Sequence, residues 1–268
     1  MLHSLIVIYN KKCEDSLSLQ YLLKSSKRSD IDIIIFDNST AEFNNERYCL
    51  DHDITYYGFK KNLGLSKAYN YVIDQLDDNS GYLMILDDDT LITDSYIEEV
   101  FHQIERGHAN ELFLPIVYAG SFILSPSNVK YRSGVRAIKN IDQIDINKIT
   151  AINSGMIVGL KIYKTIRYNE NLFLDCVDHD FMYEIRDSGV SIIILSSIIE
   201  QNYSRNTSGN IDDSVRKRFS LFKKDFFVYS KKRKGLFFYI ISILKHSIEQ
   251  SIKYHNLFFI YDLFSIIN

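Results

Sequence analysis

The chain has 268 residues, of which 46% are apolar, so it is long enough to bury a substantial core in one large or two fused domains. Its 31 Lys and Arg residues are balanced by 34 Asp and Glu residues. The net charge of -3 gives no general basic field, so we expect no nucleic-acid partner. Cys13, Cys49 and Cys176 show no metal-binding or disulfide spacing, which is typical of a reducing cytoplasm.

The N-terminus enters the apolar run Leu5–Tyr9 directly, without the basic region, long apolar stretch and cleavage site of a signal peptide. No segment offers about 18 uninterrupted apolar residues, so we expect no membrane-spanning helix. These features predict a cytoplasmic protein.

The first third of the chain alternates apolar runs with polar, helix-like stretches. The apolar runs are Leu5–Tyr9, Ile31–Phe36 and Tyr82–Leu86, and helix-like stretches cover 14–25 and 65–76. This β-α-β-α-β rhythm predicts a parallel sheet, whose buried strands are rich in Ile, Leu and Val.

Polar residues follow each of the three runs: Asn10 follows the first, Asp37–Ser39 the second and Asp87–Asp89 the third. Ligands of parallel sheets bind beyond the carboxyl ends of the strands. The sequence therefore predicts that these three strand ends face one crevice.

The acidic triplet Asp87–Asp89 is the strongest local signal for chemistry. Three adjacent carboxylates repel one another unless a cation or hydrogen-bond donors compensate them. A divalent ion, Mg²⁺ or Mn²⁺, shared with diphosphate oxygens would compensate them. The alternative is a solvated turn in which Asp88 or Asp89 caps a following helix.

Five motifs occur in an order and spacing that resemble a known family. They are Ile6–Asn10, Asp37–Ser39, Asn62–Asn70, Leu86–Thr90, and Asn153–Met156 followed by Leu172–Phe181 and Arg186. Over about its first 210 residues the chain is similar to the inverting family 2 glycosyltransferases. The resemblance is to the bacterial rhamnosyltransferase-like branch, which builds surface polysaccharides.

The resemblance implies an α/β fold of the GT-A type, a Rossmann-like and mostly parallel sheet flanked by helices. Residues 1–110 would bind the nucleotide-sugar, and residues 111–210 of the same domain would bind the acceptor and supply the catalytic base. Residues 211–268 are expected to form a helical C-terminal extension.

The resemblance also implies a donor site and a divalent metal site. The donor site comprises Tyr9, Asn10, Asp37, Asn38, Asn62, Gly64, Lys67, Asp87 and Asp88. Asp37 would read the pyrimidine base, Asp87 would lie near the ribose and Asp89 would bind Mn²⁺ or Mg²⁺. Gly64 would let the loop backbone approach the nucleotide, although an ordinary helix start capped by Asn62 is the alternative.

For the transfer step, the resemblance implies Asp178 as the general base that deprotonates the acceptor hydroxyl. Asp175 and Asp180 are the other candidates, and they are expected to bind the acceptor together with Ser154 and Gly155. An Asp at a helix start is also a common cap.

One departure from the family concerns the metal. The family often carries a His after the next strand, and Gln201 stands at about that position here. A Gln carbonyl is a weaker ligand than imidazole, so the ion would depend mainly on Asp89 and the diphosphate. His179 is interpreted as a surface residue.

The predicted function is that of an inverting glycosyltransferase, with dTDP-rhamnose or a UDP-hexose as donor and a lipid-linked glycan as acceptor. A sugar nucleotidyltransferase is one alternative, although the segment after the first strand lacks a Gly-rich phosphate loop. A non-catalytic nucleotide-binding partner protein with the same fold is the other.

The C-terminal region is basic at Lys231–Lys234 and then apolar in two runs, 235–244 and 257–267, each too short to span a bilayer. The pattern predicts docking on the inner face of the cell membrane, with the basic residues at anionic headgroups. Packing on the catalytic domain or a homodimer seam is the alternative.

Overall fold

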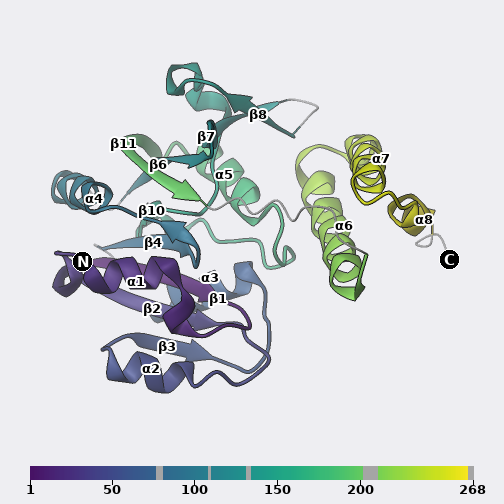
Figure 1. The fold of residues 1–268 in the computed structure, drawn as a ribbon. Helices are drawn as coiled ribbons and strands as arrows, with labels where there is room; N and C mark the ends of the chain where they lie inside the picture. The colour runs from purple at the N-terminus through teal and green to yellow at the C-terminus, as the bar shows by residue number, and fades with distance from the viewer. Residues whose placement is uncertain (77–80, 108–109, 131–133, 202–210, 265–268) are drawn as a thin grey trace.

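The computed structural model describes residues 1–76, 81–107, 110–130, 134–201 and 211–264 (Figure 1). In these residues eleven strands form one mixed sheet, in which eight strands follow the order β3-β2-β1-β4-β10-β6-β11-β5. The strands are β1 (Leu2–Ile8), β2 (Ile31–Asp37), β3 (Thr55–Gly58), β4 (Tyr82–Asp87), β5 (Thr90–Leu91), β6 (Glu111–Ala119), β7 (Phe122–Lys130), β8 (Gly134–Ile138), β9 (Ile149–Thr150), β10 (Met156–Gly159) and β11 (Ser191–Gln201).

The first half of the sheet is parallel, because β3, β2, β1 and β4 run in the same direction. Asp37 of β2 pairs with Ile8 of β1, and Asp87 of β4 pairs with the adjacent Val7. The two aspartates therefore lie on opposite sides of the β1 carboxyl end. Two strand spacings separate them, about 10 Å.

The second half is mixed: β10 runs antiparallel to β4 and β6, whereas β11 runs parallel to β6 and antiparallel to β5. Strands β7, β8 and β9 extend from β6 as an antiparallel branch. The middle region thus continues the first sheet.

The eight α-helices of the described residues are α1 (Leu17–Lys24), α2 (Asn45–Asp51), α3 (Leu65–Gln75), α4 (Asp94–Arg106), α5 (Val177–Ser188), α6 (Asp213–Arg233), α7 (Leu236–Lys253) and α8 (Phe258–Phe264). Successive side chains of a strand point to opposite faces of the sheet, so a hydrophobic core forms on each face. In β4, Leu83 and Ile85 join the core under α3 and α5, whereas Met84 and Leu86 join the core under α1 and α4.

Two cysteines far apart in sequence meet in the second of these cores. The Sγ atoms of Cys13 and Cys49 lie 3.8 Å apart, and both thiols are buried and free. This distance is well beyond the roughly 2 Å of a disulfide bond.

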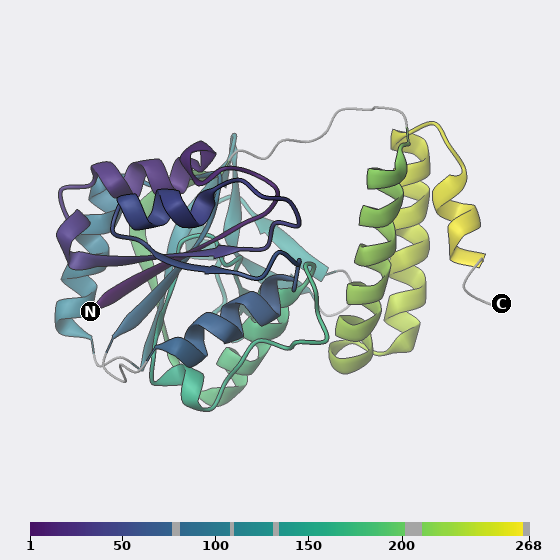
Figure 2. The ribbon, with the colours of Figure 1, turned by 90° about the horizontal axis from the view of Figure 1, so that it is seen from below.

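Helices α6–α8 form a layer beside the α/β body, with α7 packed on α6 and α8 (Figures 1 and 2). Asp212 caps α6 by accepting the Val215 N–H at 2.9 Å, and Lys231–Arg233 lie in its last turn, where cations favour the helix dipole. None of the helices in the described part of the chain combines the length and hydropathy needed to cross a bilayer.

Candidate active site

The acidic turn begins at Asp87, the last residue of β4, and continues through Asp88 and Asp89 to β5. Asp88 forms an ion pair with Lys11 at 2.7 Å, and its carbonyl oxygen accepts the Leu17 N–H at 2.9 Å. These contacts hold the turn against the segment that follows β1. The predicted contact of Asp88 with the donor stays a prediction.

Asp87 is half-buried, and its Oδ2 accepts a 2.8 Å hydrogen bond from the side-chain amide of Gln201. Burial and then the negative charges of Asp89 and Asp178 raise the pKa of Asp87 to about 6, although a hydrogen bond from Ser154 opposes the shift. Burial and the charge of Asp88 also raise the pKa of Asp89. The site therefore holds more negative charge than its own residues compensate.

This excess charge suits a divalent cation shared with a diphosphate. Mg²⁺ and Mn²⁺ prefer oxygen ligands, and Mg²⁺ commonly takes one or two protein carboxylates together with phosphate oxygens. Asp87 and Asp89 supply carboxylates of this kind. Within the described residues, no three His, Cys, Asp or Glu side chains are grouped so that they would hold a metal ion.

Gln201, predicted as a metal ligand, is the last residue of β11 and pairs with Thr90 of β5. Its Nε2 donates a hydrogen bond to Asp87, so the amide oxygen remains as an acceptor at the acidic turn. His179 is half-buried and its Nδ1 lies 2.8 Å from the Thr150 hydroxyl, so it is a structural partner of β9. The metal role of Gln201 stays a prediction.

Asp37 lies on the other side of β1 and is 5% exposed. Its carboxylate accepts hydrogen bonds from Asn45 at 2.7 Å, from the Tyr56 hydroxyl at 3.1 Å and from the Ser39 N–H at 2.8 Å. A carboxylate offers about four acceptor positions, so roughly one remains for a nucleotide base. The predicted reading of the base by Asp37 stays a prediction.

Asn38 joins the end of β2 to the loop before α3. Its Oδ1 accepts the Leu63 N–H at 3.0 Å, and its Nδ2 donates to the Gly64 carbonyl at 3.3 Å. Asn62 closes the same loop by accepting the Gly64 N–H at 2.9 Å. Asn38 and Asn62 therefore shape the loop that was predicted to contact the donor.

Gly64 has a φ of +82°, and a Cβ there would lie 2.7 Å from the carbonyl oxygen of Phe173. The same oxygen accepts the Leu65 N–H at 2.7 Å. The close approach that requires glycine is thus to Phe173. The loop is joined in this way to the segment that precedes α5, whereas approach to a nucleotide stays a prediction.

Asp178 lies in the first turn of α5 and is half-buried. Its Oδ1 accepts the N–H of His179 at 2.7 Å, which orients the carboxylate, and none of the described residues forms a hydrogen bond with its Oδ2. The residue before the helix, Cys176, has a left-handed φ of 62°. Such a conformation is uncommon for a residue with a side chain and occurs preferentially at functional sites.

Helix α6 binds the acidic residues on both sides of Asp178. Asp175 forms a two-pronged ion pair with Arg218, and Asp180, which is 1% exposed, lies 2.5 Å from Arg233. Both aspartates were predicted to bind the acceptor. In the structure their carboxylates join the loop and α5 to α6, and their acceptor role stays a prediction.

Ser154 and Gly155 were also predicted to contact the acceptor, and both are used within the fold. The Ser154 hydroxyl lies 2.5 Å from that of Thr90. The Gly155 N–H donates to Ile85 at 2.8 Å, and its carbonyl accepts the Tyr96 hydroxyl at 2.7 Å. Their acceptor contacts stay predictions.

Three of the residues predicted to contact the nucleotide-sugar donor lie at the surface. Tyr9 and Lys67 are exposed, and Lys67 lines a pocket of about 410 Å³ between the loop before α3 and α6. Asn10, with a φ of 49°, accepts the Thr40 N–H at 3.0 Å and so joins the ends of β1 and β2.

The sequence analysis did not identify the residues that hold Asp37 and the segment before Asp178 in place. Asn45 and Tyr56 reach Asp37 from α2 and β3, and no local signal marks them. Asp225 is different, because it is the single acidic residue after Asp213 in the basic helix α6, and its side chain is 1% exposed. A single acidic residue in a basic helix is a sequence signal that its carboxylate is buried and has hydrogen-bond partners.

Comparisons with known proteins identify the family and the fold. The model of the glycosyl transferase family 2 matches residues 5–165. No curated protein matches the sequence.

Solved structures share the fold at low sequence identity. GalNAc-T7 with UDP, GalNAc and Mn²⁺ has a TM-score of 0.59 and 10% identity, covering 75% of this chain and 44% of that chain. S. aureus TarS 1–349 with UDP has a TM-score of 0.55 and 15% identity, covering 85% and 65%, respectively. The same TarS segment with UDP-GlcNAc has a TM-score of 0.54 and 14% identity, covering 84% and 66%.

This chain therefore spans less than two thirds of those chains. The likeness confirms the predicted GT-A type fold, a mostly parallel sheet flanked by helices with helices α6–α8 after it.

Proposed function

Because the chain belongs to glycosyl transferase family 2, we propose that it transfers a sugar from a nucleoside diphosphate to a hydroxyl of a glycan, with inversion at the anomeric carbon. The observation that carries this proposal is the meeting of Asp87, Asp89 and Asp178 at one edge of the sheet. Burial and then the negative charges of Asp89 and Asp178 raise the pKa of Asp87, which is consistent with three carboxylates within electrostatic reach of one another. This neighbourhood supports the proposal that Asp87 and Asp89 on the donor side act together with Asp178 as the base.

In the proposed reaction Asp178 accepts the proton of the acceptor hydroxyl through its Oδ2. The acceptor oxygen then attacks the anomeric carbon as the bond to the diphosphate breaks, so no covalent enzyme intermediate is needed. A base of this kind must lie within hydrogen-bond reach of the hydroxyl. The ion pairs of α6 with Asp175 and Asp180 support this role, because they fix the segment on both sides of Asp178.

Asp89 and Asp87 are the residues that would hold Mn²⁺ or Mg²⁺, with Gln201 as the neighbouring amide. When bound, such an ion stabilises the charge on the departing diphosphate. The carboxylate pair also positions the ribose side of the donor, since Asp87 is fixed by Gln201.

For the donor, we favour a uridine nucleotide over dTDP-rhamnose. The TarS structures contain UDP and UDP-GlcNAc, and the GalNAc-T7 structure contains UDP. Asp37 supports the recognition of a pyrimidine, because it retains roughly one acceptor position for a base N–H.

For the acceptor, we propose a lipid-linked glycan reached from a membrane surface, and α7 supports this. Large apolar side chains of α7 are exposed along its length: Leu236, Phe237, Ile240, Ile241, Leu244, Ile248 and Ile252. Phe237 is 75% exposed and Ile252 is 68% exposed. Such a face, beside the basic Lys231–Lys234, is typical of an interfacial helix at anionic lipids, where each Lys or Arg contributes about 1 kcal/mol.

Liposome co-sedimentation tests the proposal that the exposed apolar face of α7 binds a membrane surface. The variant Phe237→Gln/Ile241→Gln/Ile252→Gln changes only exposed side chains, so the fold should persist while salt-sensitive binding to anionic vesicles is lost. Leu50→Gln, at an apolar residue that is 71% exposed on α2, is the matched control and should bind like wild type. Absence of wild-type binding to anionic vesicles would favour a homodimer seam, which sedimentation velocity would detect.

A donor screen tests the transferase. We expect titration calorimetry to show Mn²⁺-dependent UDP binding, and incubation with UDP-sugars to release UDP slowly even without acceptor. Failure to bind any nucleoside diphosphate would identify a non-catalytic protein. Release of pyrophosphate from a nucleoside triphosphate and a sugar phosphate would identify a nucleotidyltransferase instead.

A further inference from the structure

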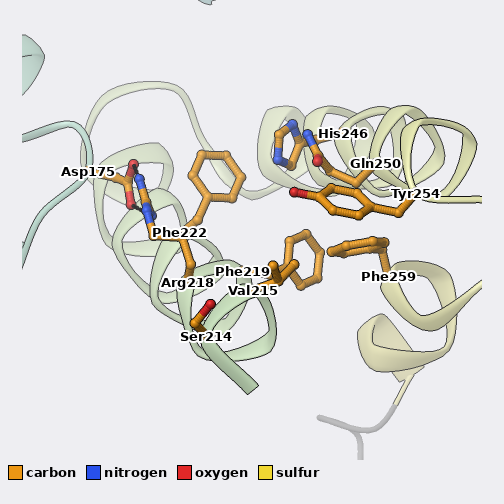
Figure 3. Close-up of a pocket in the computed structure, with 10 residues that line it drawn as sticks. All are labelled: Asp175, Ser214, Val215, Arg218, Phe219, Phe222, His246, Gln250, Tyr254 and Phe259. Atoms are coloured by element: carbon orange, nitrogen blue, oxygen red, sulfur yellow. Dashed lines mark hydrogen bonds and ion pairs between the residues drawn. The ribbon is translucent and has the colours of Figure 1, made fainter. Parts of the chain in front are cut away.

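A pocket of about 580 Å³ lies between α6, α7 and α8 and reaches Asp175 (Figure 3). This volume is within the usual range of small-molecule sites. Aromatic rings form much of its wall: Phe219, Phe222, Tyr254, Phe259 and the imidazole of His246. None of the roles proposed above uses these rings.

The walls are held by ring contacts outside the acidic turn. Phe219 meets Phe259 edge-on at 4.9 Å, and Phe222 lies 4.4 Å from His246. Both Phe219 and Phe259 are buried, which fixes the floor of the pocket. The pocket is therefore preformed by packing between the helices.

The charged groups of the pocket compensate one another. Arg218 is paired with Asp175 through both of its terminal nitrogens, and the two side chains lie together at the edge of the pocket (Figure 3). Burial lowers the pKa of His246, so its imidazole is neutral at pH 7. A lining without net charge favours a neutral ligand over an anion or a cation.

Three polar side chains of the pocket have no hydrogen-bond partner among the residues that the structure describes. His246 and Gln250 lie on α7, and Tyr254 directly follows the helix. The three follow one another at four-residue intervals and so form one row (Figure 3). Within the described part of the chain, the Gln250 amide, the Tyr254 hydroxyl and the His246 ring nitrogens form no hydrogen bond. They are available to a ligand that carries hydroxyl groups.

We propose that this pocket binds neutral sugar units of the acceptor glycan. A pyranose ring presents apolar C–H faces to aromatic rings and hydroxyls to the polar row, which is the chemistry that the lining offers. Asp175 lines the pocket and stands three residues before Asp178, so one end of the pocket lies on the loop that leads to the proposed base. The inference rests on the proposed transferase function and assigns α6–α8 as its acceptor side.

Intrinsic fluorescence tests the pocket directly, because the chain contains no Trp. Phe222→Trp places a single reporter in the wall, and Tyr254→Trp is a second reporter in case the first variant does not fold. Phe227→Trp is the matched control, since Phe227 is exposed on the same helix and does not line the pocket. The probes are neutral disaccharides: maltose, lactose and chitobiose.

We expect at least one disaccharide to change the emission of the Phe222→Trp or the Tyr254→Trp protein saturably, while the Phe227→Trp protein does not respond. Adding Gln250→Ala should weaken that binding about tenfold, which corresponds to about 1.4 kcal/mol, because the ligand loses a hydrogen-bond partner. No response of either reporter, or a response to decanol in place of sugars, would overturn the proposal in favour of an empty or lipid-binding pocket. UDP release from UDP-sugars is measured on the same proteins: its presence without a sugar response rejects only the pocket, whereas its absence rejects the transferase.

Discussion

The carboxylate of Asp225 in α6 accepts the backbone N–H of Asp175 at 2.8 Å and also the N–H groups of Leu174 at 2.7 Å and Phe173 at 2.9 Å. Three consecutive N–H groups on one buried carboxylate form a rigid support for the segment that leads to Asp178. Because the Phe173 carbonyl also accepts the Leu65 N–H, Asp225 indirectly supports the loop of Gly64. Helix α6 is thus part of the proposed active site.

Asp225→Asn should lower kcat per folded molecule about tenfold or more, because displacing a reacting group by 1 Å can cost about 100-fold. The amide nitrogen of Asn cannot accept an N–H, so the Phe173–Asp175 segment shifts. Donor KM should stay close to wild type, and Asp213→Asn, in the exposed first turn of α6, is the control. An unchanged kcat with only a lower melting temperature would show that Asp225 serves stability alone.

Asp178→Asn should lower turnover by about 10² or more, because positioned general bases contribute on that scale, while donor binding stays near wild type. Calorimetry with UDP and initial rates of transfer separate the two effects. Asp175→Asn and Asp180→Asn are the companions, since they weaken ion pairs with Arg218 and Arg233. Full activity of Asp178→Asn beside an inactive companion would assign the base to that companion.

The stability of the protein should depend on pH through Asp87. Burial and the nearby carboxylates raise its pKa from 3.8 to about 6 in the folded state. Between these pH values the folded protein keeps a proton that the unfolded chain releases, so the contribution of Asp87 to stability falls as the pH rises from about 4 to 6.

Asp87→Asn removes the free-energy cost of ionising a buried carboxylate in the folded state. The variant should therefore melt above wild type at pH 7.5, and the difference should shrink towards pH 4.5. Asp94→Asn is the control, because Asp94 is an exposed aspartate in the first turn of α4. Scanning calorimetry across this range checks the prediction, and a difference in melting temperature that does not vary with pH would refute it.

Several parts of this site were predictable from sequence. The apolar runs and their polar ends predicted the β1, β2 and β4 edge, because period-two burial and strand-end chemistry are local. The predicted family and enzyme class are confirmed by the family match over residues 5–165. The rhamnosyltransferase branch stays a prediction.

What sequence did not predict depends on contacts between distant segments. Phe173 approaches Gly64 across more than a hundred residues, and the glycine was attributed to a nucleotide. The antiparallel insertion of β10 between β4 and β6 also has no local signature. Helix α6 was expected as part of a helical C-terminal extension, but no local pattern marked the ion pairs of its last turn with Asp180, which join it to α5. Tertiary pairing, not local propensity, set these positions.

The metal prediction can be tested at two residues. Asp89→Ala should weaken Mn²⁺-dependent UDP binding at least tenfold, which corresponds to about 1.4 kcal/mol, and EDTA should abolish wild-type transfer. Gln201→His is the informative partner, because Gln201 already donates to Asp87 at 2.8 Å and imidazole is a better ligand than an amide oxygen. We expect this variant to bind Mn²⁺ more tightly in the presence of UDP. Full transfer in EDTA, together with unchanged Mn²⁺ affinity of Gln201→His, would instead make the enzyme metal-independent, with the charge of the leaving diphosphate balanced by protein donors alone.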